Sequence, residues 1–320
     1  MISIFRNNTP LAIGLLILLA IIPELNSVAS AYDKVPEQST IVFGLFHQLG
    51  IWLGYEQGIA GKIIRISVSF VAALLINRMV TDHKLMEKPG FLPAMCYLLL
   101  QLLIPAPISF HILVTNILLL ATLKIMILVY KLERPMNSLL GAGFLLGTIA
   151  LIDSTAILFF AWLTTALLIM RPASLREWLM ALTGYGLPIY FLSAILYLLD
   201  RFALNTIYNS PDLDFTIPTY TAAIWARISI VLFVPWVSFF MTSQQISKLL
   251  IQGRKTFIIS FIMSILLMVL VLSDLPMIMQ SIHLTLVPAT LLMAPVLVHS
   301  RKTIFPNLFI LAMLVLSQLR

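Results

Sequence analysis

Residues 23–65 read PELNSVASAYDKVPEQSTIVFGLFHQLGIWLGYEQGIAGKIIR, the longest stretch of the chain that a plain membrane span cannot explain. The first apolar run breaks at Pro23 and Glu24, and more acidic residues follow. The second half, 41–55, is apolar but interrupted by glycines and polar residues. This pattern is typical of a helix that lies along a membrane surface rather than crossing it. The stretch therefore predicts a first outer loop over 24–58 that contains a surface helix.

The composition of the whole chain is that of a membrane protein. Of its 320 residues, 60% are apolar and only 10% are charged, and the mean hydropathy is +1.02. Lipid offers no hydrogen-bond partners to the backbone, and no alternating barrel pattern is seen, so we expect all spans to be helices. The net charge of +7 is interpreted as positively charged cytoplasmic loops and not as a nucleic-acid surface. The single Cys96 can form no internal disulfide.

The apolar runs predict an all-α polytopic helix bundle with about eleven spans and one integral membrane domain over 1–320. A second outer loop is expected at 200–219. The predicted spans are 11–22, 59–80, 91–104, 108–130, 138–152, 155–170, 178–199, 222–241, 257–272, 277–298 and 304–319.

The first span is short, and two interpretations of it stay open. The residues Ala29-Ser30-Ala31 resemble a signal-peptidase site, so the span could be a cleaved signal peptide. We favour a retained anchor, because Asn7 to Pro10 can begin its helix at the inner surface. Lys and Arg residues then gather in one set of turns and most acidic residues in the other, which places the N terminus in the cytoplasm and the C terminus outside.

Acidic residues at the outer ends of spans are the candidates for chemistry. Glu24 and Asp33 of the first loop could act as general bases, because partial desolvation raises the proton affinity of a carboxylate. They could also hold a divalent metal ion, or Glu24 could be a simple helix-end charge. Asp153, in the turn between two spans, is a further candidate, with a solvated turn residue as the alternative.

Arg65 and Arg227 fall near outer span ends, where the charge pattern disfavours cations. Each could bind a lipid phosphate, pair with an acid or extend to the surface. His111 and His283, in the outer halves of their spans, are further site candidates, and buried, hydrogen-bonded histidines are the favoured interpretation. His47 has no cysteine or second histidine near it in the sequence, so metal-ligand spacing is absent.

The whole chain resembles a family of multi-pass inner-membrane proteins from Bacteroidota without an assigned activity. The residues that carry this likeness are the opening MISIFRNNTP, KPGFLPAMCYLLL, IMRPASLREWLMALTGYGLPIYFL and LLMAPVLVHSRKTIFPNLFI.

The N-terminal half also resembles the GT-C glycosyltransferases, through STIVFGLFHQLGIWLGYEQGIAGKIIRISVSFVAALL and GAGFLLGTIALIDSTAILFFAWLTTALLIMRP. These enzymes take sugars from polyprenyl-phosphate carriers at the outer membrane face. The resemblance implies Glu24 or Asp33 as the catalytic acid site and Arg65 as a contact to the carrier phosphate. The chain departs from the pattern in lacking paired acids in the loop and in having Asp153 near where a Lys is often found, and we expect no soluble C-terminal domain.

Two functions follow from these patterns. The first is a GT-C-like transferase that uses a polyprenyl-phosphate-linked sugar at the periplasmic face. The second is a non-catalytic scaffold or assembly component of envelope biogenesis with membrane protein partners. A transporter is less favoured, because no inverted repeat or interrupted helix pair is seen.

Overall fold

The computed structural model describes residues 2–6, 10–26, 41–55, 58–83, 85–86, 90–152, 158–172, 174–200, 218–246, 251–273, 275, 278–299 and 304–318. Regular structure in these ranges is helical throughout. The helices are α1 (Ile2–Arg6), α2 (Pro10–Asn26), α3 (Ile41–Trp52), α4 (Gly58–Asp82), α5 (Leu92–Leu103), α6 (Phe110–Val129), α7 (Met136–Ile152), α8 (Leu158–Met170), α9 (Leu175–Leu198), α11 (Ala222–Ile246), α12 (Ile251–Ser273), α13 (Ile278–Ser281), the 3₁₀-helix η3 (Ile282–Thr285), α14 (Leu286–His299) and α15 (Ile304–Gln318).

The all-helical class predicted from composition is confirmed. Within the described residues, six helical segments are long and apolar enough to cross a membrane: Gly58–Asp82, Phe110–Val129, Leu175–Leu198, Ala222–Thr242, Ile251–Ser273 and Ile278–Val298. Shorter apolar helices, among them α2, α5, α7 and α8, lie beside them. An α-helix satisfies its own backbone hydrogen bonds, which is why such apolar segments fold this way in lipid. The count of eleven spans stays a prediction.

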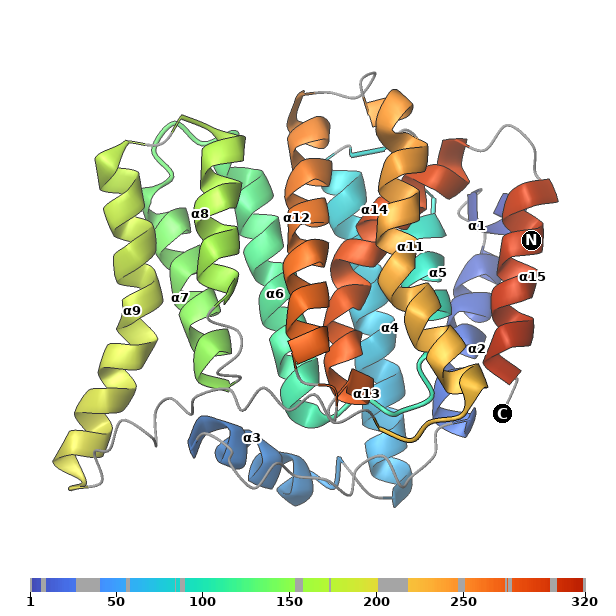
Figure 1. The fold of residues 1–320 in the computed structure, drawn as a ribbon, viewed down its shortest axis with the longest axis horizontal. Helices are drawn as coiled ribbons and strands as arrows, with labels where there is room; N and C mark the ends of the chain where they lie inside the picture. The colour runs from blue at the N-terminus through green and yellow to red at the C-terminus, as the bar shows by residue number, and fades with distance from the viewer. Residues whose placement is uncertain are drawn as a thin grey trace.

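The helix α3 lies across one end of the bundle, transverse to the long helices (Figure 1). We call this the α3 end; α2 ends there, and α4, α6 and α11 begin there (Figure 1). The first residues of α3, Ile41 and Val42, pack against Leu151 of α7 and Leu196 of α9. The predicted helix at 41–55 therefore exists as Ile41–Trp52, and it has the transverse direction expected of a surface helix.

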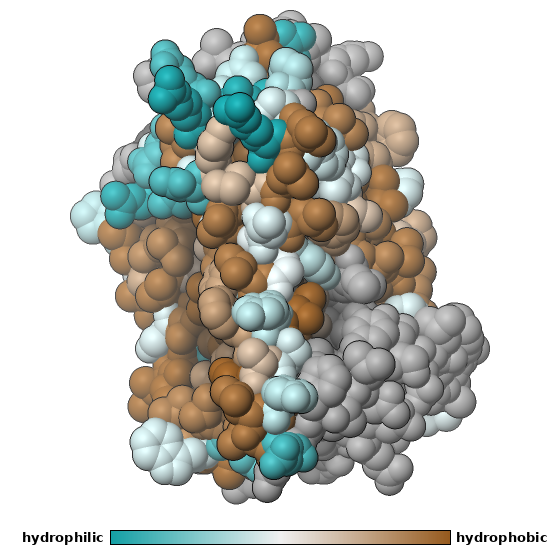
Figure 2. All heavy atoms as spheres, turned by 90° about the vertical axis from the view of Figure 1, so that its left-hand side faces the viewer, coloured by the Kyte–Doolittle hydropathy of each residue, from teal (hydrophilic) through white to brown (hydrophobic). Residues whose placement is uncertain are grey.

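The helices α5 and α14 form the centre of the bundle. Every residue of α5 is buried, and α2, α4, α14 and α15 pack around it. At the edge, α9 exposes apolar side chains such as Leu179 and Phe191. Figure 2 shows this edge, with apolar side chains over its middle and hydrophilic ones gathered at the end away from α3. Such a band is what a bilayer requires of a helix that faces lipid.

Glycines allow α7 and α9 to pack backbone to backbone. A side chain at Gly143 or Gly147 would collide with the backbone of Ala181 or Tyr185, and one at Gly184 would collide with that of Leu140. Small residues at such contacts are the usual means of close helix packing in membranes. Hydropathy along the sequence does not reveal this contact.

Candidate functional site at the α3 end

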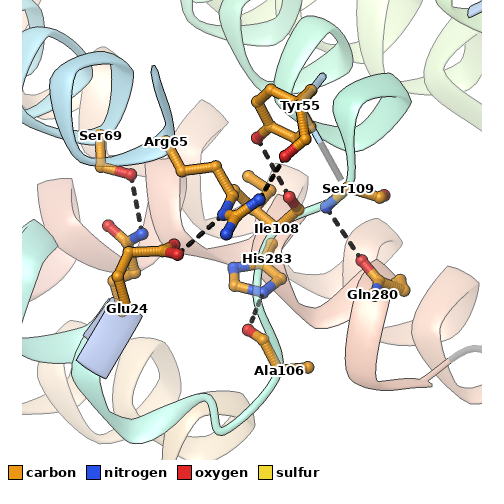
Figure 3. A network of polar contacts seen from close by, with 10 residues as sticks. Glu24, Tyr55, Arg65, Ser69, Ala106, Ile108, Ser109, Gln280 and His283 are labelled. Atoms are coloured by element: carbon orange, nitrogen blue, oxygen red, sulfur yellow. Dashed lines mark hydrogen bonds and ion pairs between the residues drawn. The ribbon is translucent and has the colours of Figure 1, made fainter. Parts of the chain in front are cut away.

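Two oppositely charged side chains meet inside the α3 end. Glu24 lies in the last turn of α2, and Arg65 lies two turns into α4. Arg65 Nε donates a hydrogen bond to Glu24 Oε2 at 2.8 Å (Figure 3). The two side chains are only 4% and 5% exposed. Taking two charges out of water is costly, so the pair is stable only because each neutralises the other.

Tyr55 connects this ion pair to the chain that follows α3. Arg65 Nη1 donates to the Tyr55 carbonyl, and the guanidinium lies 5.5 Å from the centre of the Tyr55 ring. The Tyr55 hydroxyl donates to the Ile108 carbonyl at 3.0 Å. Gly61 leaves room for this arrangement, because a Cβ there would collide with the Tyr55 backbone. The C-terminal end of α3 is thus fastened to α4 and to the turn that precedes α6 (Figure 3).

That turn, residues 104–109, is held by polar side chains from the centre of the bundle. Prolines at 105 and 107 have no backbone donor, so the turn depends on other hydrogen bonds. His283 Nε2 donates to the Ala106 carbonyl at 3.1 Å, and the Ser109 backbone N donates to Gln280 Oε1 at 3.2 Å. His283 is 1% exposed, as expected for a buried histidine. Its own carbonyl accepts a hydrogen bond from Asn116 Nδ2 at 3.1 Å.

A second pair of polar side chains lies beside the ion pair (Figure 3). Gln101 Nε2 donates to Ser69 Oγ at 2.8 Å, and both residues are buried. The network therefore joins α2, α4, α5, α13 and η3 near the α3 end.

The fold also brings two histidines close to one aromatic ring. The Phe43 ring of α3 lies 4.4 Å from the His111 ring and 6.5 Å from the His47 ring, centre to centre. Ser109 Oγ lies 3.5 Å from His111 Nε2. His47 thus has a second histidine in its neighbourhood, which its sequence spacing did not indicate. Among the residues that the structure describes, no three metal-binding side chains come together.

Arg227 differs from Arg65 in its surroundings. It lies in the second turn of α11, is 6% exposed, and its Nε has no hydrogen-bond partner in the described part of the chain. The structure places no carboxylate of the described residues within ion-pair distance of it. Both predicted arginines are therefore buried, but only Arg65 is seen with a neutralising partner.

The remaining predicted site residues fall outside the described ranges. Asp33 and Asp153 both do, as does nearly all of the second outer loop. Tyr55 and Gln280, which hold the network together, were missed. The only signal for Tyr55 was its position between two glycines, Gly54 and Gly58, both of which have positive φ angles.

Comparison with known protein families, with curated proteins and with solved structures finds no match for this chain. The fold alone defines the class: an all-helical protein whose apolar helices fit a lipid bilayer. No closer assignment follows from similarity.

Proposed function

We propose that this chain is a multi-pass protein of a bacterial inner membrane that transfers a sugar from a polyprenyl-phosphate carrier at the periplasmic face. In this proposal the α3 end faces the periplasm and the N terminus lies in the cytoplasm, as the distribution of Lys and Arg favours. The proposed enzyme is of the GT-C type, which the N-terminal half of the chain resembles.

One observation carries the proposal. Glu24 in the last turn of α2, the transverse helix α3 and Arg65 near the start of α4 come together at one end of the bundle. A GT-C-like enzyme needs these three parts together, because its donor lies in the membrane and its acceptor approaches from water. Charged side chains are rarely buried unless they are paired, so the burial of this acid and this arginine, 41 positions apart, distinguishes this end of the bundle.

The ion pair suggests a division of work between the two predicted acids. Glu24 holds Arg65 and so has a positioning role, with Arg65 directed to the phosphate of the donor. Asp33 is then the general base that takes the proton of the acceptor hydroxyl. The acceptor oxygen forms a bond to the anomeric carbon, and the bond from that carbon to the carrier phosphate breaks. The phosphate leaves with the electron pair, and a cation lowers the energy of its developing charge.

A non-catalytic scaffold is the second candidate, and the same ion pair also supports this function. The Glu24 carboxylate already has a buried partner, which suits a structural fastening of α3. In that case α3 would present its exposed residues Leu45, Leu49 and Trp52 to the membrane surface or to a protein of the cell envelope.

The experiment that separates the two is a lipid analysis in the native organism. We would replace Asp33→Asn and Glu24→Gln separately on the chromosome, with a full deletion beside them, and quantify polyprenyl-phosphate-linked sugars by mass spectrometry. Glu133→Gln is the matched control, since Glu133 is an exposed acid in the α6–α7 turn. Immunoblots would verify that each variant is present in the membrane.

For a transferase, a carrier-linked sugar accumulates in the Asp33→Asn strain and in the deletion, but not in the Glu133→Gln strain. If neither the deletion nor the variants change the carrier-linked sugars, the transferase is discarded, and partner proteins become the subject of study.

A further inference from the structure

Arg227 is a buried cation for which the described part of the chain provides no anion. Its side chain is on the same face of α11 as Val231 and Val234, which are also buried. The helix packs against α14, α12, η3 and α5, so this face looks into the bundle. An isolated charge in such surroundings is strongly unfavourable, and buried charges in membrane helices are normally paired. Arg227 therefore needs a partner that the described residues do not contribute.

The depth of Arg227 indicates where that partner comes from. Tyr220 and Trp225 form an aromatic pair, with ring centres 5.9 Å apart, at the start of α11. Tyrosine and tryptophan are enriched at the level of lipid headgroups. With a helical rise of about 1.5 Å per residue, Arg227 lies only about 3 Å deeper than Trp225 along the axis. Arg227 is therefore close to the residues expected at the level of lipid headgroups.

The chemistry of the side chain narrows the class of partner further. A guanidinium has a planar fork of donors that matches two oxygens of a phosphate, and it stays charged when buried. One of its donors, Nε, is buried and without a hydrogen bond among the described residues. Residues next to Arg227 on the helix, Ala226 and Ser229, are exposed, so the first turns of α11 are open to lipid on one side.

We propose that Arg227 is the binding site for the phosphoryl group of a membrane lipid at the α3 end. With the proposed function, on which this inference rests, the lipid is the polyprenyl-phosphate carrier, and Arg227 holds it at the same end of the bundle as the Glu24–Arg65 pair. The binding itself requires only a lipid phosphate, so it can be tested apart from any transfer reaction.

The test uses the full-length protein, delipidated in an uncharged detergent. Four probes are added in turn: a polyprenyl phosphate, the same polyprenol without phosphate, phosphatidylglycerol and inorganic phosphate. Native mass spectrometry measures retained lipid, and thermal unfolding measures the shift in Tm. The proteins are the wild type, Arg227→Met, Arg227→Lys and the control Lys62→Gln, which removes an exposed cation at the same end.

We expect a phosphate-bearing lipid to be retained by the wild type and by Lys62→Gln and to raise the Tm of both. Polyprenol and inorganic phosphate should do neither. Arg227→Met should lose at least tenfold in retained lipid, and Arg227→Lys should keep part of the Tm shift, because an ammonium binds phosphate as a point charge. Without lipid, Arg227→Met should unfold at a higher Tm than the wild type, since it removes an unpaired buried charge.

Three results overturn the site. Arg227→Met could unfold at a lower Tm than the wild type without lipid, which would mean a partner within the protein. Arg227→Met could show the same lipid-induced rise in Tm as the wild type. Alternatively, inorganic phosphate alone could raise the Tm of the wild type as much as the lipid does. The proposed function fails separately: binding of phosphatidylglycerol without polyprenyl phosphate supports the site but removes the proposed donor. Binding of polyprenyl phosphate, with unchanged carrier-linked sugars in Asp33→Asn cells, supports the site and removes the transfer reaction.

Discussion

Arg65 and Glu24 are 41 positions apart in the chain, yet Arg65 Nε and Glu24 Oε2 lie 2.8 Å apart, with both side chains buried in the bundle. Removing one partner leaves the other as an unpaired buried charge, whereas removing both leaves none. We therefore expect Glu24→Leu and Arg65→Met each to lower the free energy of unfolding by about 3–5 kcal/mol. The double variant Glu24→Leu with Arg65→Met should recover most of that loss.

Thermal unfolding of the four proteins in detergent measures this coupling. Additive losses in the double variant would show that the two side chains act independently. If Arg65 is also needed for transfer, the double variant should be well folded but inactive in the lipid analysis, which separates fold from chemistry.

The Tyr55 hydroxyl fastens the end of α3 to the turn before α6, through the Ile108 carbonyl. Tyr55→Phe keeps the ring beside Arg65 but removes this hydrogen bond, at a cost of about 1 kcal/mol. We expect faster hydrogen exchange in residues 41–52 and little change in the centre of the bundle. Equal changes in α5 and α3 would contradict a local fastening.

The contact between α7 and α9 can be tested with two glycines of one helix. A Cβ at Gly143 collides with the backbone of α9, whereas one at Gly141 meets nothing within 4 Å. Gly143→Ala should therefore destabilise the protein by about 1–3 kcal/mol through overpacking. Gly141→Ala should stabilise it by up to about 1 kcal/mol, because alanine is the better helix former. Fluorescence-detected size exclusion after heating compares the two, and the same response from both would refute the close packing.

His83, which follows α4 at the end away from α3, should make stability depend on pH. Burial and the nearby Lys131 lower the pKa of His83 below its ordinary value of 6.5. The folded protein therefore binds a proton here less readily than the unfolded chain does. The contribution of neutral His83 to the stability is complete above about pH 6.5 and is lost as the pH falls through the lowered pKa.

His83→Gln should remove this part of the acid sensitivity. We would measure Tm for the variant and the wild type between about pH 5 and pH 8, a range that includes the ordinary pKa of histidine. As the pH falls, the Tm of His83→Gln should rise relative to the Tm of the wild type. A constant difference over the whole range would mean that His83 does not titrate differently in the folded state.

Sequence patterns were informative about elements and much less so about their contacts. The stretch 23–65 predicted α3 to within a few residues, because an apolar run broken by glycines and polar residues is typical of a surface helix. Glu24 and Arg65 were both selected, as charges at the ends of apolar spans. Their pairing was one of several alternatives, because no local periodicity relates residues on two helices separated by a long loop.

The contacts made by Tyr55 and the glycines were missed for the same reason. Tyr55 meets Ile108 across 53 positions, and Gly143 meets Ala181 across two helices. Each depends on how the helices pack, and hydropathy does not specify that packing. Asp33 and Asp153 remain predictions from the sequence.

The Glu24–Arg65 pair also has a consequence for biogenesis. When α4 enters the membrane during synthesis, it carries a guanidinium that lipid alone solvates poorly. The carboxylate that neutralises it has already been made, at the end of α2. We therefore expect α2 and α4 to leave the insertion machinery together, as a hairpin joined by its charges. A nascent chain lacking Glu24 should then stall or invert at this step, before any of the later helices has been synthesised.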